Sequence, residues 1–134
     1  MFQPYKSHAQ AYSKVYVETG VESADPHQLV SLLIDGALSA IAAAHRAIDQ
    51  SDLDAKVKAI RRATGIVEDG LLGSLDMAGG GAVAQTLENL YRCVLFRLTF
   101  ALAKNDTAPL RECSELLTPL RDAWLAIGPK RLAS

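Results

Sequence analysis

The chain has few of the residues from which catalytic or metal centres are built. It contains two cysteines and three histidines in 134 residues. None of His8, His27 and His45 follows a glutamate at the Glu-x-x-His spacing with which helical bundles bind paired metal ions. Carboxylates paired on one face in an apolar setting, as acid–base catalysis needs, are also missing. We therefore expect neither an enzyme nor a bound cofactor.

The chain also has no large excess of positive or negative charge and no long apolar run. The net charge is −1, so no basic field would attract nucleic acid or anionic lipid. Residues 1–20 carry scattered polar side chains and do not resemble a signal peptide, and no segment reaches the roughly 18 to 20 apolar residues of a membrane span. These features predict a cytoplasmic protein that does not insert into a membrane.

The two cysteines lie in segments that we expect to form neighbouring helices. If the chain turns near Asp106, Cys93 lies farther from the turn than Cys113 does. At about 1.5 Å per residue the two positions are offset by roughly 9 Å along the bundle. Because that offset is too long for a disulfide, we expect two buried thiols.

Hydrophobic residues, 49% of the chain, recur at helical spacing. The densest segment, residues 87–103, has two apolar faces. A helix that is apolar nearly all round must be surrounded, because each large side chain left in water forgoes about 1.5 to 3 kcal/mol of burial. Either other helices of this chain or a partner must cover the second face. That face consists of Cys93, Phe96, Phe100 and Ala103.

Four segments with helical periodicity predict an all-α, antiparallel up-and-down four-helix bundle over residues 25–128. Asp25 can cap the first helix, and Pro26 fits its first turn. We expect residues 1–24 to form a flexible N-terminal arm that either docks by its tyrosines or has no role, and residues 129–134 to form a short tail. The four helices are expected at about residues 25–50, 52–76, 82–104 and 107–127.

Glycine and proline interrupt two of these helices. Each glycine inside a helix costs about 1 kcal/mol relative to alanine, so Gly65, Gly70 and Gly73 need a packing reason or a frayed end. Small residues let another helix approach closely, and the spacing leaves open whether that helix belongs to this chain or to a partner. Pro119 should kink the fourth helix, because proline removes a backbone hydrogen bond.

The surplus apolar surface predicts a protein-interaction site, such as a groove for an amphipathic helix. A different class of protein is the alternative. In that reading the chain is a self-associating structural bundle, and its extra apolar surface is a homodimer interface. On spacing alone, Tyr91 and Trp124 are aromatic residues of the core.

Short motifs occur in a characteristic order along residues 11–127. They are Ala11-Tyr12, Ser23 to Pro26, Leu33-Ile34-Asp35-Gly36-Ala37, Gly73-Ser74-Leu75-Asp76, Val83-Ala84 with Leu87, Leu90-Tyr91, Arg97-Leu98 and Leu120-Arg121-Asp122-Ala123-Trp124. Their order and spacing resemble the FliS family of flagellar export chaperones. The chain departs from the family pattern at Ile34, where an aromatic residue is usual, and at Pro119.

The resemblance implies a cytoplasmic chaperone of bacterial flagellum biogenesis. Its client would be flagellin, whose disordered C-terminal segment folds as helices in apolar grooves and is kept from premature polymerisation until type III export. Components of the flagellar export gate are further candidate partners. By the same analogy the N-terminal arm covers part of the groove in the free state, with Tyr12 as the plug.

We assign the client groove to residues of the second and third helices, with Tyr12 added from the arm. The assignment follows from the second apolar face that each of these helices presents. The predicted groove residues are Tyr12, Ile66, Gly70, Gly73, Leu75, Tyr91, Leu95 and Leu98.

Overall fold

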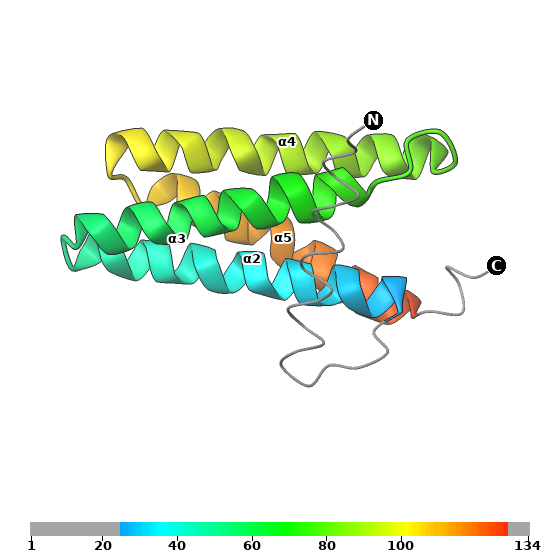
Figure 1. The fold of residues 1–134 in the computed structure, drawn as a ribbon, viewed down its shortest axis with the longest axis horizontal. Coiled ribbons are helices and arrows are strands. Elements are labelled where there is room, and N and C mark those ends of the chain that lie inside the picture. The colour runs from blue at the N-terminus through cyan, green and yellow to red at the C-terminus, as the bar shows by residue number, and fades with distance from the viewer. Residues whose placement is uncertain (1–24, 129–134) are drawn as a thin grey trace, which may run out of the picture.

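In the computed structural model, residues 25–128 are described, and they form four long helices packed side by side (Figure 1). Successive helices run in opposite directions, and the described residues contain no strand. The predicted all-α, antiparallel bundle is therefore confirmed. The predicted arm with Tyr12 and the predicted tail lie outside the described residues. The long helices are α2 (Pro26–Asp49), α3 (Leu53–Gly65), α4 (Gly81–Lys104) and α5 (Ala108–Ile127).

The helices surround one apolar core. α2 packs against α3 and α5, while α4 packs against α5 and the end of the second helical segment. Each long helix contributes side chains that are fully withdrawn from solvent, so the core is continuous through the bundle. The largest of these side chains are Leu33, Ile34, Ile41, Ile60, Leu98, Leu110 and Leu117.

One described helix, α2, is long and apolar enough by length and composition alone to cross a membrane, although the sequence led us to expect none. In the structure its apolar stripe, which includes Leu33, Ala37 and Ile41, is buried against the other helices. The central helix of a bundle has the same composition, because it is apolar around much of its circumference.

The start of α2 is fixed by its cap and by the end of α5. The Asp25 carboxylate accepts a hydrogen bond from the Gln28 backbone amide, as the predicted cap requires, and the Gln28 side-chain oxygen accepts one from the Asp25 backbone amide, which completes a capping box. His27 Nε2 lies 2.6 Å from the Trp124 carbonyl oxygen, and Trp124 Nε1 donates to the His27 carbonyl at 2.9 Å. Their rings are stacked with centroids 5.3 Å apart. These contacts hold the first turn of α2 against the end of α5.

The second helical segment changes its winding where the sequence is rich in glycine. α3 ends at Gly65 and continues as a π-helix, η1 (Ile66–Leu71), and then as a 3-10 turn, η2 (Leu72–Ser74), so a regular α-helix to residue 76 was wrong. Gly70 faces α2, where a Cβ would lie 3.0 Å from Leu33 Cδ2. The close packing of these two segments explains the glycine at this position.

α5 remains helical through Pro119, whose ring is exposed. The turn before α5 contains Asn105, whose φ of 54° is left-handed and ends α4. Asp106 accepts a hydrogen bond from the Ala108 amide at 3.0 Å and so satisfies one of the free amides at the start of α5. The predicted turn at residues 105–107 is confirmed.

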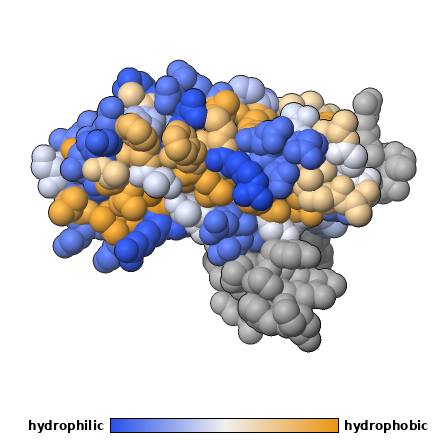
Figure 2. All heavy atoms as spheres, turned by 90° about the horizontal axis from the view of Figure 1, so that it is seen from above, coloured by the Kyte–Doolittle hydropathy of each residue, from blue (hydrophilic) through white to orange (hydrophobic). Residues whose placement is uncertain are grey.

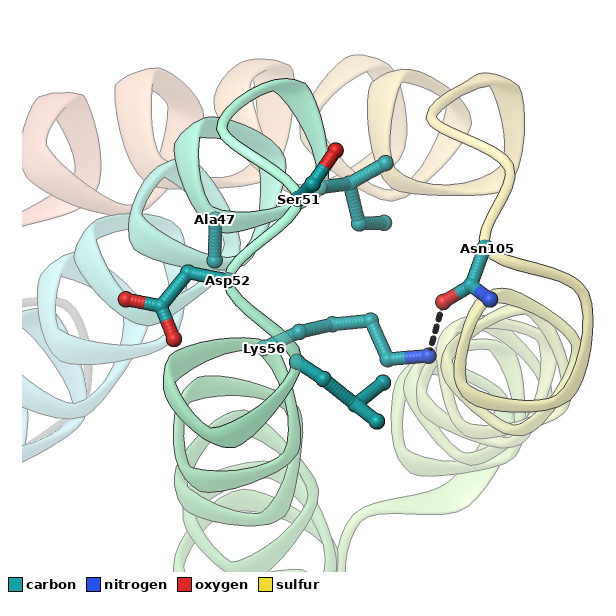
Figure 3. A pocket seen from close by; sticks show the side chains of 7 residues that line it. Ala47, Ser51, Asp52, Lys56 and Asn105 are labelled. Atoms are coloured by element: carbon teal, nitrogen blue, oxygen red, sulfur yellow. Dashed lines mark hydrogen bonds between the residues drawn. The ribbon is translucent and has the colours of Figure 1, made fainter.

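A buried lysine ties α3 to the end of α4. Lys56 is only 3% exposed, and its Nζ donates to the Leu102 carbonyl at 2.9 Å and to the side chain of Asn105 (Figure 3). The last carbonyls of a helix lack amide partners and carry partial negative charge. The ammonium group therefore caps α4 from a neighbouring helix. It also borders a pocket of about 330 Å³.

We expect Lys56→Met to lower the free energy of unfolding by about 1 to 3 kcal/mol, because it leaves a helix-terminal carbonyl without its partner. Urea unfolding followed by circular dichroism measures the loss. The matched control is Lys58→Met, which alters an exposed lysine of the same helix and should stay within about 0.5 kcal/mol of wild type. Equal effects of the two substitutions would contradict this role of Lys56.

Candidate interaction surface

The second apolar face of α4 is exposed. Phe96 is 67% exposed and Phe100 is 46% exposed, and their ring centroids lie 6.5 Å apart. Seen from the side on which α4 lies, apolar surface gathers over the part of the bundle that holds the C-terminal half of this helix (Figure 2). The first face of α4 is covered by the core, and the second is not. We call Phe96 and Phe100 the aromatic pair.

The aromatic pair borders a groove of about 330 Å³ between α4 and the start of α5. Ala108 and Pro109 line its α5 side, so most of the nearby surface is apolar or small. Arg97 lies in the same lining, with its Nε 3.2 Å from Glu112 Oε1. These two atoms are at ion-pair distance but are not aligned for a hydrogen bond. The groove therefore has an apolar wall, and its charged lining residues are the Arg97–Glu112 pair and Asp106.

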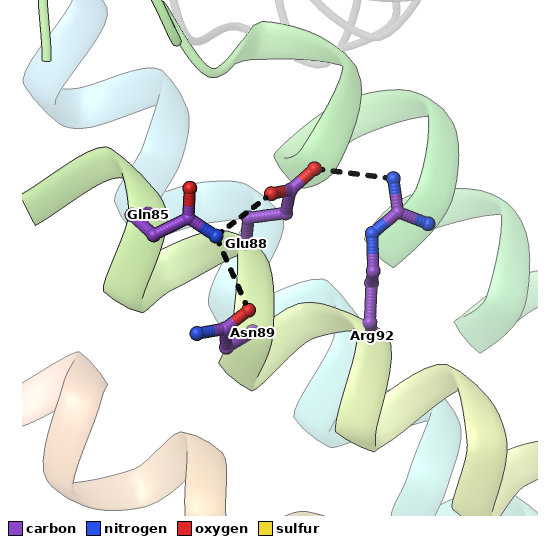
Figure 4. Close-up of polar contacts among 4 residues, drawn as sticks. All are labelled: Gln85, Glu88, Asn89 and Arg92. Carbon is purple, nitrogen blue, oxygen red and sulfur yellow. Dashed lines mark hydrogen bonds and ion pairs between the residues drawn. The ribbon is translucent and has the colours of Figure 1, made fainter. Parts of the chain in front are cut away.

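The first half of α4 is polar on its outer side. Gln85 Nε2 donates to Glu88 at 3.2 Å and to Asn89 at 3.4 Å, and Arg92 pairs with Glu88 at 3.2 Å (Figure 4). Glutamate four residues before arginine is a favourable helical pair. This polar ladder satisfies itself along the helix, so Val83 is the one large apolar side chain exposed in the first half of α4, and the aromatic pair lies in the second half.

Four of the predicted groove residues are buried in the core. Ile66, Tyr91 and Leu98 are at most 4% exposed, and Gly70 is buried against α2. Side chains in this position make no direct contact with a partner while the bundle keeps this arrangement. Tyr91 is instead the core aromatic residue that spacing alone predicted. A binding role for these four residues stays a prediction.

Three predicted groove residues remain partly accessible. Gly73 and Leu75 line a pocket of about 370 Å³ at the end of η2, next to the exposed Met77. Leu95 is half-buried and packs against the core. The eighth residue, Tyr12, lies outside the described residues. The structure therefore does not bring the predicted set together on one open groove.

The aromatic pair was missing from the predicted binding set, although the sequence contained a signal for it. Phe96 and Phe100 belong to the face that needed cover from outside α4. The contribution of α5, through Ala108 and Pro109, had no such signal. Which helix flanks an exposed face depends on how the bundle packs, and spacing within one helix does not carry that information.

The buried thiol of Cys113 and the buried hydroxyl of Tyr91 are poorly suited to chemistry at neutral pH. Burial raises the pKa of the Cys113 thiol from 9.0 to about 12, although the nearby Arg97 acts in the opposite direction. Burial also raises the pKa of Tyr91 to about 12. Both cysteines are free, as predicted, but Cys93 is half-buried where we expected a buried thiol. Among the described residues, no cluster of potential metal ligands occurs.

The family model described as Flagellar protein FliS matches residues 8–131 of this chain. The chain belongs to the FliS family. The flagellar secretion chaperone FliS of Salmonella typhimurium is 40% identical over 121 residues, which are 90% of this chain and 90% of that protein. FliSB of Pseudomonas aeruginosa is 37% identical over 117 residues, or 87% and 92% of the two chains. Escherichia coli FliS is 36% identical over 115 residues, or 86% and 85%.

Membership of the FliS family identifies the chain as a flagellar secretion chaperone. This function is not enzymatic, which agrees with the expectation drawn from composition. It also confirms the resemblance that the ordered motifs suggested. The aromatic pair is an open apolar surface of this FliS chain, and open apolar surfaces are typical of protein-interaction sites.

The raised pKa values predict how stability depends on pH. Because the folded state keeps the Cys113 proton when the unfolded chain has lost it, the free energy of unfolding should fall as pH rises from about 9 towards 12. Urea titrations at increasing pH measure this decline. Cys113→Ala should make it shallower, whereas Cys93→Ala leaves the buried thiol in place and should keep it. Stability that rises over this range would contradict the assignment.

Proposed function

We propose that this chaperone binds the disordered C-terminal segment of flagellin in the cytoplasm, prevents its premature polymerisation and holds it for type III export. The observation that carries the proposal is the aromatic pair beside the groove between α4 and α5. A client helix would lay its apolar face against Phe96 and Phe100. Removing these side chains from water supplies the free energy of binding.

A disordered client loses conformational entropy when it folds on the chaperone, and burial of apolar surface must offset that loss. One aromatic pair offers limited area, so we infer a longer path over the bundle. Gly73, Leu75 and Leu95 are the predicted groove residues that remain partly accessible, and they support a second contact near η2 and α4. The four buried residues of the predicted set would pack beneath these accessible residues and hold them in position.

Calorimetric titration with a peptide of the flagellin C-terminal segment from the same organism tests the proposal. We expect one-to-one binding with a large negative heat-capacity change, as coupled folding onto an apolar surface requires. The double variant Phe96→Ala/Phe100→Ala should weaken binding about tenfold or more, since exposed aromatic anchors often dominate an interface. Its folding stability should change little, because both rings are exposed in the free protein.

The matched control is Val83→Ala, which truncates a side chain that is 68% exposed on the same helix but outside the groove. It should leave the affinity unchanged. A folded wild-type protein that does not bind the peptide would contradict the proposed client. Light scattering over a concentration series then tests the alternative, a homodimer built on the aromatic pair, because an obligate dimer persists on dilution without a client.

A further inference from the structure

A second groove lies on the other side of α5 from the aromatic pair. Its volume is about 450 Å³, and it runs between the C-terminal part of α2 and the N-terminal part of α5. Its floor is formed by Ile41 and Leu110, both fully buried from solvent. Ala42 lies on the α2 wall and carries no side chain beyond Cβ, which leaves room above the floor. An apolar side chain from outside can therefore pack on the exposed Ala42, above these two buried residues.

Two arginines flank this groove from opposite helices. Arg46 comes from α2 and Arg111 from α5, and both side chains are exposed. Arg111 reaches Thr107 only through a long hydrogen bond of 3.4 Å. Among the described residues, neither arginine has a carboxylate at ion-pair distance. Both guanidinium groups are thus free to bind an anion.

The remaining charged groups of the lining do not cancel this positive charge. Glu115 is the only carboxylate among the lining residues that the structure describes. His45 is engaged with Asp49 of its own helix, with 3.1 Å between Nδ1 and Oδ2. Counting Arg46 and Arg111 against Glu115 leaves the lining at +1, in a chain whose net charge is −1. The groove is a local site of positive charge with an apolar floor.

We propose that this arginine groove, formed by Ile41, Arg46, Leu110 and Arg111, binds an amphipathic helix of the client that carries an acidic side chain beside an apolar one. The apolar side chain packs on the exposed Ala42, above the buried Ile41 and Leu110, and the carboxylate binds the guanidinium groups that flank the groove. This inference rests on the proposed function. The client would then contact both sides of α5, with one segment on the aromatic pair and another in the arginine groove.

The groove makes such a charge pair stronger than a pair on open surface. An exposed ion pair contributes little, because water screens it. A client helix that covers the groove excludes water and lowers the effective dielectric constant around the guanidinium groups. Arginine also binds a carboxylate through two parallel hydrogen bonds, which fixes the position of the client helix. Charge pairs at an interface further make association depend on salt.

The experiment titrates the full chain with the flagellin C-terminal peptide at low and at high salt. We expect Arg46→Glu/Arg111→Glu to weaken binding about tenfold or more at low salt and to flatten the dependence on salt. The milder variant Arg46→Gln/Arg111→Gln should change the affinity and its salt dependence in the same direction. It still provides the test if the charge-reversed variant does not fold. Replacing the acidic residues of the peptide by their amides should abolish the difference between wild type and these variants.

The matched control is Arg61→Glu/Arg62→Glu, which changes the net charge equally through two exposed arginines of α3 that do not line the groove. It should bind the peptide as wild type does. If the groove variant and the control variant weaken binding equally, the effect is one of net charge and the inference is overturned. It is also overturned if the groove variants keep wild-type affinity and salt dependence, and the proposed function then stands. A flat titration with wild-type protein instead contradicts the proposed function itself.

Discussion

The burial of α2 is the constraint on which the rest of the bundle depends. This helix packs against α3, η1 and α5, so three segments must fit around one alanine-rich surface. Gly70 meets it closely at Leu33, and the reciprocal contacts of His27 with Trp124 hold its first turn against the end of α5. Once α5 is fixed on α2 in this way, its first turns are left to flank α4, and this places a groove on either side of α5.

The two apolar faces of α4 differ in their exposure to solvent. One face, with Val94 and Leu98, completes the core. The opposite face, with Phe96 and Phe100, keeps its aromatic rings in water. Covering such an open apolar surface with a partner lowers the free energy. For a secretion chaperone, this provides a physical reason to bind an export substrate.

The sequence predicted the fold more fully than the site. Capping at Asp25 and Gln28, the turn near Asp106 and four periodic segments were enough for the architecture, because they depend on neighbours within about one helical turn. The client groove was harder to assign. Tyr91 and the aromatic pair both lie on apolar faces of one helix, and the choice of which face turns inward depends on the other helices.

The role of Lys56 also depends on how the other helices pack, and spacing within one helix does not reveal it. Lys56 lies at core spacing with Ile60 and Ala63, but a lysine in that pattern does not reveal that the end of another helix will accept its charge. The arginine groove is also a tertiary feature, since Arg46 and Arg111 line one groove only after α2 and α5 have packed. Periodicity therefore identifies that a surface is apolar, while packing decides whether it becomes core or binding site.

Hydroxyl-radical footprinting of the free protein and of its complex with the flagellin C-terminal peptide shows whether the aromatic pair is the surface that the client covers. It measures the solvent exposure of individual side chains without changing the sequence. We expect Phe96 and Phe100 to be oxidised readily in the free protein and to be protected in the complex, while the exposed Val83 of the same helix reacts equally in both. A complex in which Phe96 and Phe100 remain as reactive as in the free protein would contradict this expectation.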